Sequence, residues 1–428
     1  MGPSWVAGAV AAGPATMASL VTAGATFGYD LLWVVICSAL FGSLAQYLAV
    51  RVGLATERGI VSAVRTHLGR RWAWLLVVDT VLAAGLAQLV ITKGLADVSA
   101  AVTGVDGRAW GVVWAVVLAV GLAGRGYRFV ETVAKLLVAA VVVAFLASLA
   151  VVPVDPVAAA GGVVPSLPGG VDGALVAAGI LGGAVHVTLV TMHTYTIRAR
   201  GWTTRDAGLA TFDVGASMLV AFGVYSLAVF LVAASVFAGA DVAPSELTAL
   251  SASQALGPLV GASAEWLFLL GLLGAALSTL GGNTVAPPFV LADALGWDTD
   301  VSDDRYRALL AGFALLSALG PFVGGAFFPL LVLVLAFGLV GTPFALVVVL
   351  AVLHADGVPT DPSRSLTAGG VVLVLVTAVL AGNFARGHVT PFPPTEPLSV
   401  AVTLFAVGLG LATLGLVGDR LRRRVVDA

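Results

Sequence analysis

The sequence predicts an all-α protein that crosses a membrane many times, with about twelve spanning helices. Two observations support this fold class. Charged residues make up only 10% of the 428 residues and hydrophobic residues 59%, whereas soluble domains carry about 25% charged residues. The apolar residues also fall into runs of about 20, which is the length that an α-helix needs to cross a bilayer. We therefore expect residues 1–428 to form a single transmembrane domain.

Basic residues between the apolar runs indicate the topology. Arginines gather after every second run through the eighth, and again in the C-terminal tail. Because cytoplasmic loops carry the excess of Lys and Arg, we expect both termini on the cytoplasmic side of the plasma membrane. The amphipathic stretch 54–68 is expected to lie at the inner membrane surface or to form a short cytoplasmic helix. The predicted spans are 5–27, 29–50, 73–103, 107–124, 127–152, 173–197, 207–238, 262–293, 306–322, 326–353, 367–384 and 397–418.

Several function classes are disfavoured by what the chain lacks. Its single cysteine, Cys37, excludes an intramolecular disulfide and a cysteine-rich metal site. A phosphate-binding GxxxxGK[ST] motif is absent, which argues against an ATP-driven pump. We expect no enzymatic activity, no cofactor and no nucleic-acid partner. The expected partners are the lipid bilayer and a transported ion or small solute.

The first predicted span is interrupted by Gly13-Pro14-Ala15-Thr16. Proline lacks an N–H and its ring clashes with the preceding turn, so the helix kinks or breaks there. A simple kink is common in membrane helices. A true break needs partners for the freed backbone groups, and secondary transporters place substrate and ion sites at such breaks.

A matching break is expected in the sixth span, which reads GILGGAVHVTLVTMHTY from Gly179. This segment is dense in polar groups and carries two adjacent glycines but no proline. The two breaks would relate inverted repeats of about 1–152 and 173–353, followed by extra helices at about 367–384 and 397–418. Such an inverted-repeat arrangement with broken first and sixth helices is the LeuT-like transporter fold.

Several segments together resemble one transporter family. The start GPSWVAGAVAAGPATMASLVTAGATFGYDLLWVV is similar to the first helices of the NRAMP (natural resistance-associated macrophage protein) divalent-metal transporters. LFLLGLLGAALSTLGGNTVAPPFVLADALGW resembles the eighth helix of that family, VGTPFALVVVLAVL its tenth, and RFVETVAK the start of its fifth. The resemblance implies the broken-helix scaffold, a divalent metal ion as the transported substrate, and a link to protons.

The chain departs from the family where the metal would bind. The family's DPGN motif falls on the stretch Gly13 to Thr16, so its aspartate and asparagine are replaced. The family's remaining site positions carry mostly apolar or neutral residues here. Its Met-Pro-His run falls on Val187, Thr188 and Leu189, its third-helix acidic pair on Gly85 and Gln88, and its tenth-helix glutamine on Leu335.

The remaining donors predict a site for a partly hydrated ion. Mg²⁺ keeps several waters and needs fewer direct ligands than Fe²⁺, so Mg²⁺ or Mn²⁺ is the expected class. The ligands would be backbone carbonyls and polar side chains at both breaks, with Thr16 and His186 as the metal-contacting side chains. Alternatively, Thr16 bonds back to its own helix. The predicted binding residues are Ala12, Gly13, Thr16, His186, Thr188 and Thr191.

Three further residues are candidates for a proton pathway: Asp79, Gln88 and His193. Histidine and aspartate are rare inside membrane spans and are functional candidates by default. The alternatives are a structural His193 bonded to neighbouring helices and an Asp79 close to the membrane–water interface. His186 and His193 are about 10 Å apart along one helix, too far for one ion. Lys93 and Asp97 are four residues apart and are expected to pair.

Two other functions share the same scaffold. One is an ion-coupled symporter of an amino acid or other small organic solute, whose carboxylate would lie at a half-helix N-terminus. The other is a membrane sensor without transport. The sensor is the least favoured function, because the break itself is retained. A divalent-metal transporter, which the resemblance to the NRAMP family implies, is the leading interpretation.

Overall fold

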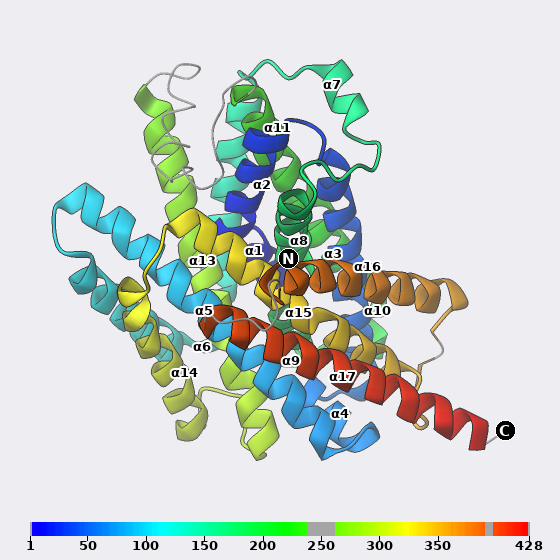
Figure 1. Ribbon diagram of the computed structural model, residues 1–428. Coiled ribbons are helices and arrows are strands. Elements are labelled where there is room, and N and C mark those ends of the chain that lie inside the picture. Colours follow the sequence, from blue (N-terminus) through cyan, green and yellow to red (C-terminus); the bar gives the residue numbers. More distant parts are fainter. Residues whose placement is uncertain (1, 238–261, 361, 390–396, 427–428) are drawn as a thin grey trace.

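The structure is a computed structural model, and it describes residues 2–237, 262–360, 362–389 and 397–426 (Figure 1). Every regular element in these ranges is a helix. The first part of the chain contains α1 (Ser4–Ala11), α2 (Pro14–Phe27), α3 (Leu32–Thr56), α4 (Ile60–His67), α5 (Arg70–Thr103), α6 (Gly107–Leu149) and α7 (Pro156–Gly161). The second part contains α8 (Val171–Val185), α9 (Val187–Ala199), η1 (Thr204–Asp206), α10 (Ala207–Val214), η2 (Gly215–Phe222), α11 (Gly223–Val236), α13 (Ala262–Leu295), α14 (Asp304–Leu316), η4 (Ser317–Phe322), α15 (Phe327–Leu353), α16 (Arg364–Val389) and α17 (Pro397–Val426).

Membrane-spanning helices dominate the described part of the chain. Eight helical stretches there are long and apolar enough to cross a bilayer, or nine if the bent pair α1–α2 counts as one span. The predicted span 262–293 lies within the 34-residue helix α13, whereas 306–322 divides into α14 and the 3₁₀ turn η4. The fold class, a polytopic all-α protein, is confirmed.

Helix α6 corrects one predicted boundary. We expected two spans, 107–124 and 127–152, with a loop at Arg125 and Arg128, but α6 is one helix of 43 residues. At about 1.5 Å per residue, 43 helical residues are enough to cross the bilayer core about twice. The stretch between the two apolar runs contains glycine but no proline. A glycine costs a helix only about 1 kcal/mol, so it does not force a break.

The core of the bundle lies around α8, α9 and α15. In the most apolar windows of Asp172–Ala199 and Pro329–Leu353, 89% and 83% of the residues are buried. The corresponding shares in Arg364–Gly387 of α16 and Ser399–Arg420 of α17 are 22% and 17%. Figure 1 shows α17 in red, reaching away from the bundle to the C-terminus.

The short helix α4 is attached to this core by its N-terminal end. Its first three amides donate to Thr194 Oγ1 (3.0 Å), the Tyr195 hydroxyl (3.3 Å) and Asp293 Oδ2 (3.0 Å). The Tyr195 hydroxyl in turn donates to the same Asp293 carboxylate at 2.8 Å, and the Ser62 hydroxyl also donates to it. The amides that begin a helix have no partner within it, so α9 and α13 together cap α4.

Candidate functional site

The first break lies at Ala12 and Gly13, between α1 and α2, which are bent by 45°. Gly13 is extended (φ −80°, ψ 177°) and Pro14 begins α2. Proline is suited to the first position of a helix, because the N–H that it lacks would have no partner there. The predicted break is therefore present, and it is more than a kink.

Side-chain hydroxyl groups donate hydrogen bonds to most of the backbone carbonyls that lose their helical partners at the first break. Thr279 Oγ1 lies 3.4 and 3.3 Å from the carbonyls of Ala9 and Val10. The Thr16 hydroxyl donates to the Ala11 carbonyl at 2.6 Å, five residues back and across the break. Thr16 thus bonds to α1 rather than to its own helix α2. Its oxygen keeps lone pairs that could contact a cation.

The second break lies at His186, where the backbone is extended (φ −53°, ψ 139°) between α8 and α9. The Thr342 hydroxyl of α15 donates at 3.0 Å to the carbonyl of Val185, the last residue of α8. His186 caps α9 through its own side chain, because Nδ1 accepts from the Thr188 amide at 3.3 Å. The predicted position of this break is correct, and a histidine cap takes the place of a proline.

The two breaks are adjacent. A methyl group at Gly183, one turn before the second break, would overlap the Thr16 side chain at the first. Thr188 Oγ1 lies 2.7 Å from His186 Nδ1, whereas the Thr191 hydroxyl donates back to the Val187 carbonyl at 2.9 Å. Of the predicted binding side chains, those of Thr16, His186 and Thr188 therefore make their hydrogen bonds at the breaks. The Thr191 side chain instead bonds within α9.

The imidazole of His186 has one nitrogen without a partner. The side chain is 4% exposed, and Nε2 makes no hydrogen bond. The ring lies against α15 at Gly338, where a Cβ atom would overlap it. The site therefore presents one ring nitrogen, Nε2, that makes no hydrogen bond to a protein group.

His193 occupies a different position from His186. Its Nδ1 lies 2.7 Å from Gln46 Oε1 and its Nε2 lies 3.0 Å from Ser4 Oγ. Since an amide oxygen only accepts, Nδ1 donates and Nε2 accepts from the hydroxyl. If Nε2 took up a proton it would become a donor, and the Ser4 hydroxyl would have to turn from donating to accepting in this hydrogen bond. The structure thus links α1, α3 and α9 through His193.

Asp79 and Gln88 lie on opposite faces of α5, because nine residues correspond to about two and a half turns. Gln88 Nε2 donates to the Phe313 carbonyl of α14 at 2.7 Å. Asp79 is 1% exposed, and neither carboxylate oxygen has a hydrogen-bond partner. It faces α15, where a Cβ atom at Gly341 would overlap its carboxylate. The structure does not bring the two predicted proton-pathway residues of α5 together.

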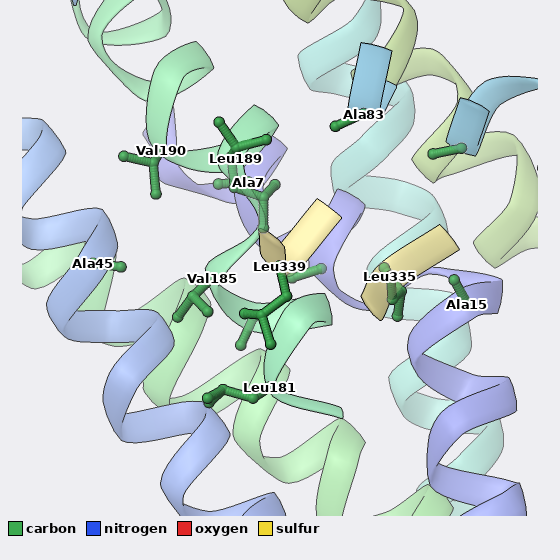
Figure 2. Close-up of a cluster of buried hydrophobic side chains, with 14 of the residues drawn as sticks. Ala7, Ala15, Ala45, Ala83, Leu181, Val185, Leu189, Val190, Leu335 and Leu339 are labelled. Atoms are coloured by element: carbon green, nitrogen blue, oxygen red, sulfur yellow. The ribbon is translucent and has the colours of Figure 1, made fainter. Parts of the chain in front are cut away.

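Buried apolar side chains also lie close to the two breaks (Figure 2). Leu335 and Leu339 of α15 lie near Ala15 of α2 and near Val185 at the end of α8. Among the described residues, no group of three His, Cys, Asp or Glu side chains could hold a metal ion. A cation here would depend on few side chains, on carbonyls and on its own water.

The sequence interpretation missed the residues of α13 and α15 that support the breaks. Ser278 and Thr279 contact the α1 carbonyls, and Thr342 contacts the end of α8. The spacing Gly338-x-x-Gly341-Thr342 places two glycines and a hydroxyl within about one turn. This spacing was the available signal, since it marks a helix face that other polar side chains can approach closely.

Comparison with known proteins agrees with this architecture. A model of the family "Natural resistance-associated macrophage protein-like" matches residues 4–385. The divalent metal cation transporter MntH of Mycobacterium tuberculosis is 29% identical over 397 residues, covering 88% of this chain and 89% of that protein. MntH of Deinococcus radiodurans is 29% identical over 395 residues, covering 89% and 88%.

Solved structures show the same fold. A manganese transporter of Eremococcus coleocola, in complex with an aromatic bis-isothiourea compound, has a TM-score of 0.75 at 18% identity, covering 97% of this chain and 92% of that one. The nucleobase-cation-symport-1 family transporter MHP1 has a TM-score of 0.54 at 15% identity, covering 95% and 96%. With the family match spanning most of its length, the chain belongs to the natural resistance-associated macrophage protein-like (Nramp) family of transporters.

Proposed function

We propose that this protein is a secondary transporter that moves a divalent metal cation of the Mg²⁺ or Mn²⁺ class. The observation that carries the proposal is the pair of adjacent helix breaks with the free Nε2 of His186 beside them. Broken helices at membrane depth hold ions on backbone carbonyls and helix ends. The relatives reported above are named divalent metal cation transporters, which supports the same cargo here.

The ligand set favours an ion that keeps part of its hydration shell. No carboxylate lies at the first break, where Gly13 stands, and Thr16 offers a hydroxyl oxygen instead. The Ala12 carbonyl and the imidazole of His186 would add two more donors. Carboxylate, carbonyl and water ligands suit Mg²⁺ and Mn²⁺, while imidazole suits later transition metals as well. The metal is the cargo, and no resident cofactor is proposed.

Topology and location complete the proposal. The protein would lie in the plasma membrane with both termini in the cytoplasm, as the distribution of arginines favours. Two inverted repeats, about 1–152 and 173–353, would place the breaks at corresponding positions. Coupling to protons belongs to the proposal too, with Asp79, Gln88 and His193 as its candidate residues.

Uptake into proteoliposomes tests the proposal. Purified full-length protein is compared with empty liposomes for uptake of Mn²⁺, of Mg²⁺ and of a panel of amino acids. We expect the uptake of the metal ion to saturate as its concentration rises. We also expect Mn²⁺ and Mg²⁺ to inhibit each other's uptake. Uptake of an amino acid without any metal uptake or competition would refute the proposal in favour of an organic-solute symporter.

A variant test addresses the site. His186→Ala should impair metal transport while expression stays normal, because it removes the free nitrogen at the second break. Unchanged transport kinetics would exclude His186 from the site. Thr191→Val is a matched control on α9, since the Thr191 hydroxyl is engaged by its own helix.

A further inference from the structure

Two buried polar side chains from distant parts of the chain share one face of α15. His186 Nε2 and both Asp79 oxygens lack hydrogen-bond partners, and the two residues are 4% and 1% exposed. Buried polar groups in proteins are nearly always hydrogen-bonded, so each exception needs an explanation such as an ion-binding function. Other buried polar atoms of the described residues, such as Thr26 Oγ1 and Ser226 Oγ, also lack a partner. The two exceptions on this face of α15 are an acceptor-only carboxylate and an imidazole nitrogen, and both kinds of group can bind metals.

Glycines on α15 bring these groups close to each other. A Cβ atom at Gly338 would overlap the His186 ring, and one at Gly341 would overlap the Asp79 carboxylate. Residues three apart on a helix have Cβ positions about 5–6 Å apart and point to the same side. His186 Nε2 and the Asp79 carboxylate therefore lie within about 10 Å of each other. A reorientation of either side chain could bring both onto one ion.

The surrounding structure fixes the position of the histidine ring. Thr188 Oγ1 contacts His186 Nδ1 at 2.7 Å, and the Thr342 hydroxyl fixes the preceding Val185 carbonyl to α15. In this structure Nδ1 accepts from the Thr188 amide, so the neutral ring carries its proton on Nε2. A metal would bind Nε2 in the other tautomer, in which Nδ1 donates to the Thr188 hydroxyl instead. Metal-binding histidines usually have their other ring nitrogen oriented by such a partner.

Among the described residues, no salt bridge joins Asp79 to a protein cation. The salt bridges among the described residues join other pairs, such as Lys93 with Asp97 on the same helix. An isolated carboxylate inside a membrane protein is costly and marks an ion pathway by default. A divalent cation would satisfy both the carboxylate and the imidazole nitrogen.

Resting on the proposed function, we propose that Asp79 and His186 form a two-ligand binding site for the transported divalent cation, on the Gly338–Gly341 face of α15. We name these four residues the α15 station. The carboxylate that is missing at Gly13 is thereby supplied by α5. Two side-chain ligands leave most of the coordination shell to water and carbonyls, so the cation is held transiently rather than as a resident metal.

Mn²⁺ binding to the full-length protein tests the station. The free Mn²⁺ signal in electron paramagnetic resonance gives the affinity of the wild type, Asp79→Asn and His186→Gln. Loss of a group that only orients a metal ligand weakens affinity about 10- to 100-fold, so removing a ligand should weaken it at least about tenfold. Asp97→Asn is the matched control, because it removes the same charge from an exposed position of the same helix.

A thermal measurement separates binding from folding. With chelator present, Asp79→Asn should melt no lower than the wild type, since the carboxylate has no partner to lose. The stabilisation that Mn²⁺ adds to the wild type should disappear in this variant. Lower melting in chelator with intact stabilisation by Mn²⁺ would identify Asp79 as a structural residue and overturn the station.

The binding outcomes are distinguishable. Weaker affinity in both variants and not in Asp97→Asn supports the station. Wild-type binding that survives either substitution overturns the shared site and leaves the proposed function intact. A wild type that binds neither Mn²⁺ nor Mg²⁺ overturns both the station and the proposed function.

Discussion

Replacing Asp293 should release helix α4 from the bundle. The buried carboxylate accepts hydrogen bonds from the Ser62 amide, the Ser62 hydroxyl and the Tyr195 hydroxyl. It also lies at the N-terminal end of α4, where a negative charge interacts favourably with the helix dipole. Asp293→Ala removes all of these interactions at once.

The magnitude follows from the kinds of bond that are lost. A hydrogen bond to a charged group contributes about 1.5–3 kcal/mol, so three of them set an upper limit of about 5–9 kcal/mol. Ser62 is only partly buried, and water can replace part of its two bonds, whereas the Tyr195 hydroxyl is enclosed. We therefore expect the free energy of opening α4 to fall by about 3–5 kcal/mol.

Hydrogen exchange measures this change directly. Amides of α4 that exchange by local opening should do so about 150-fold to 5,000-fold faster in Asp293→Ala, while those of α15 keep their rates. Asp293→Asn, which retains one acceptor oxygen, should lie between this variant and the wild type. Less than fivefold acceleration (about 1 kcal/mol) would refute the reasoning that α9 and α13 together cap α4.

Two further predictions concern the first break and the C-terminal helix. Thr16→Val should lower the melting temperature through a loss of about 1–3 kcal/mol, because the Ala11 carbonyl loses its donor; Thr16→Ser should not, and equal melting of both variants would contradict this. Burial, with added repulsion from Arg58 and Arg420, holds the pKa of His67 below 6.5, so its contribution to stability is present above pH 6.5 and is lost as the pH falls below that value. Arg420→Gln should raise this pKa, as a histidine NMR titration would show, and an unchanged midpoint would place the cause elsewhere.

The first break was predictable because its determinant is local. Pro14 cannot continue the helix of α1, and its effect depends on no other part of the chain. The second break was predicted only from its relation to the first. Nothing in the residues around His186 requires a break, and the bond from Thr342 that supports it comes from a helix more than 150 residues away.

The environment of Asp79 could not be predicted from the sequence. Its position on α5 was evident, but which face of α5 meets α15 depends on how the whole bundle packs. The same holds for His193, whose partners Ser4 and Gln46 belong to two other helices. Local sequence indicates which polar residues lie inside the membrane, whereas tertiary contacts decide whether those residues find hydrogen-bond partners.

The two glycines of α15 also place a constraint on the evolution of this protein. A side chain at position 341 and a carboxylate at position 79 would occupy the same space, and so would a side chain at 338 and the imidazole at 186. Substitutions at these positions should therefore occur in pairs among close homologues. A lineage that gains alanine at 341 is expected to have first exchanged the aspartate at 79 for a smaller residue.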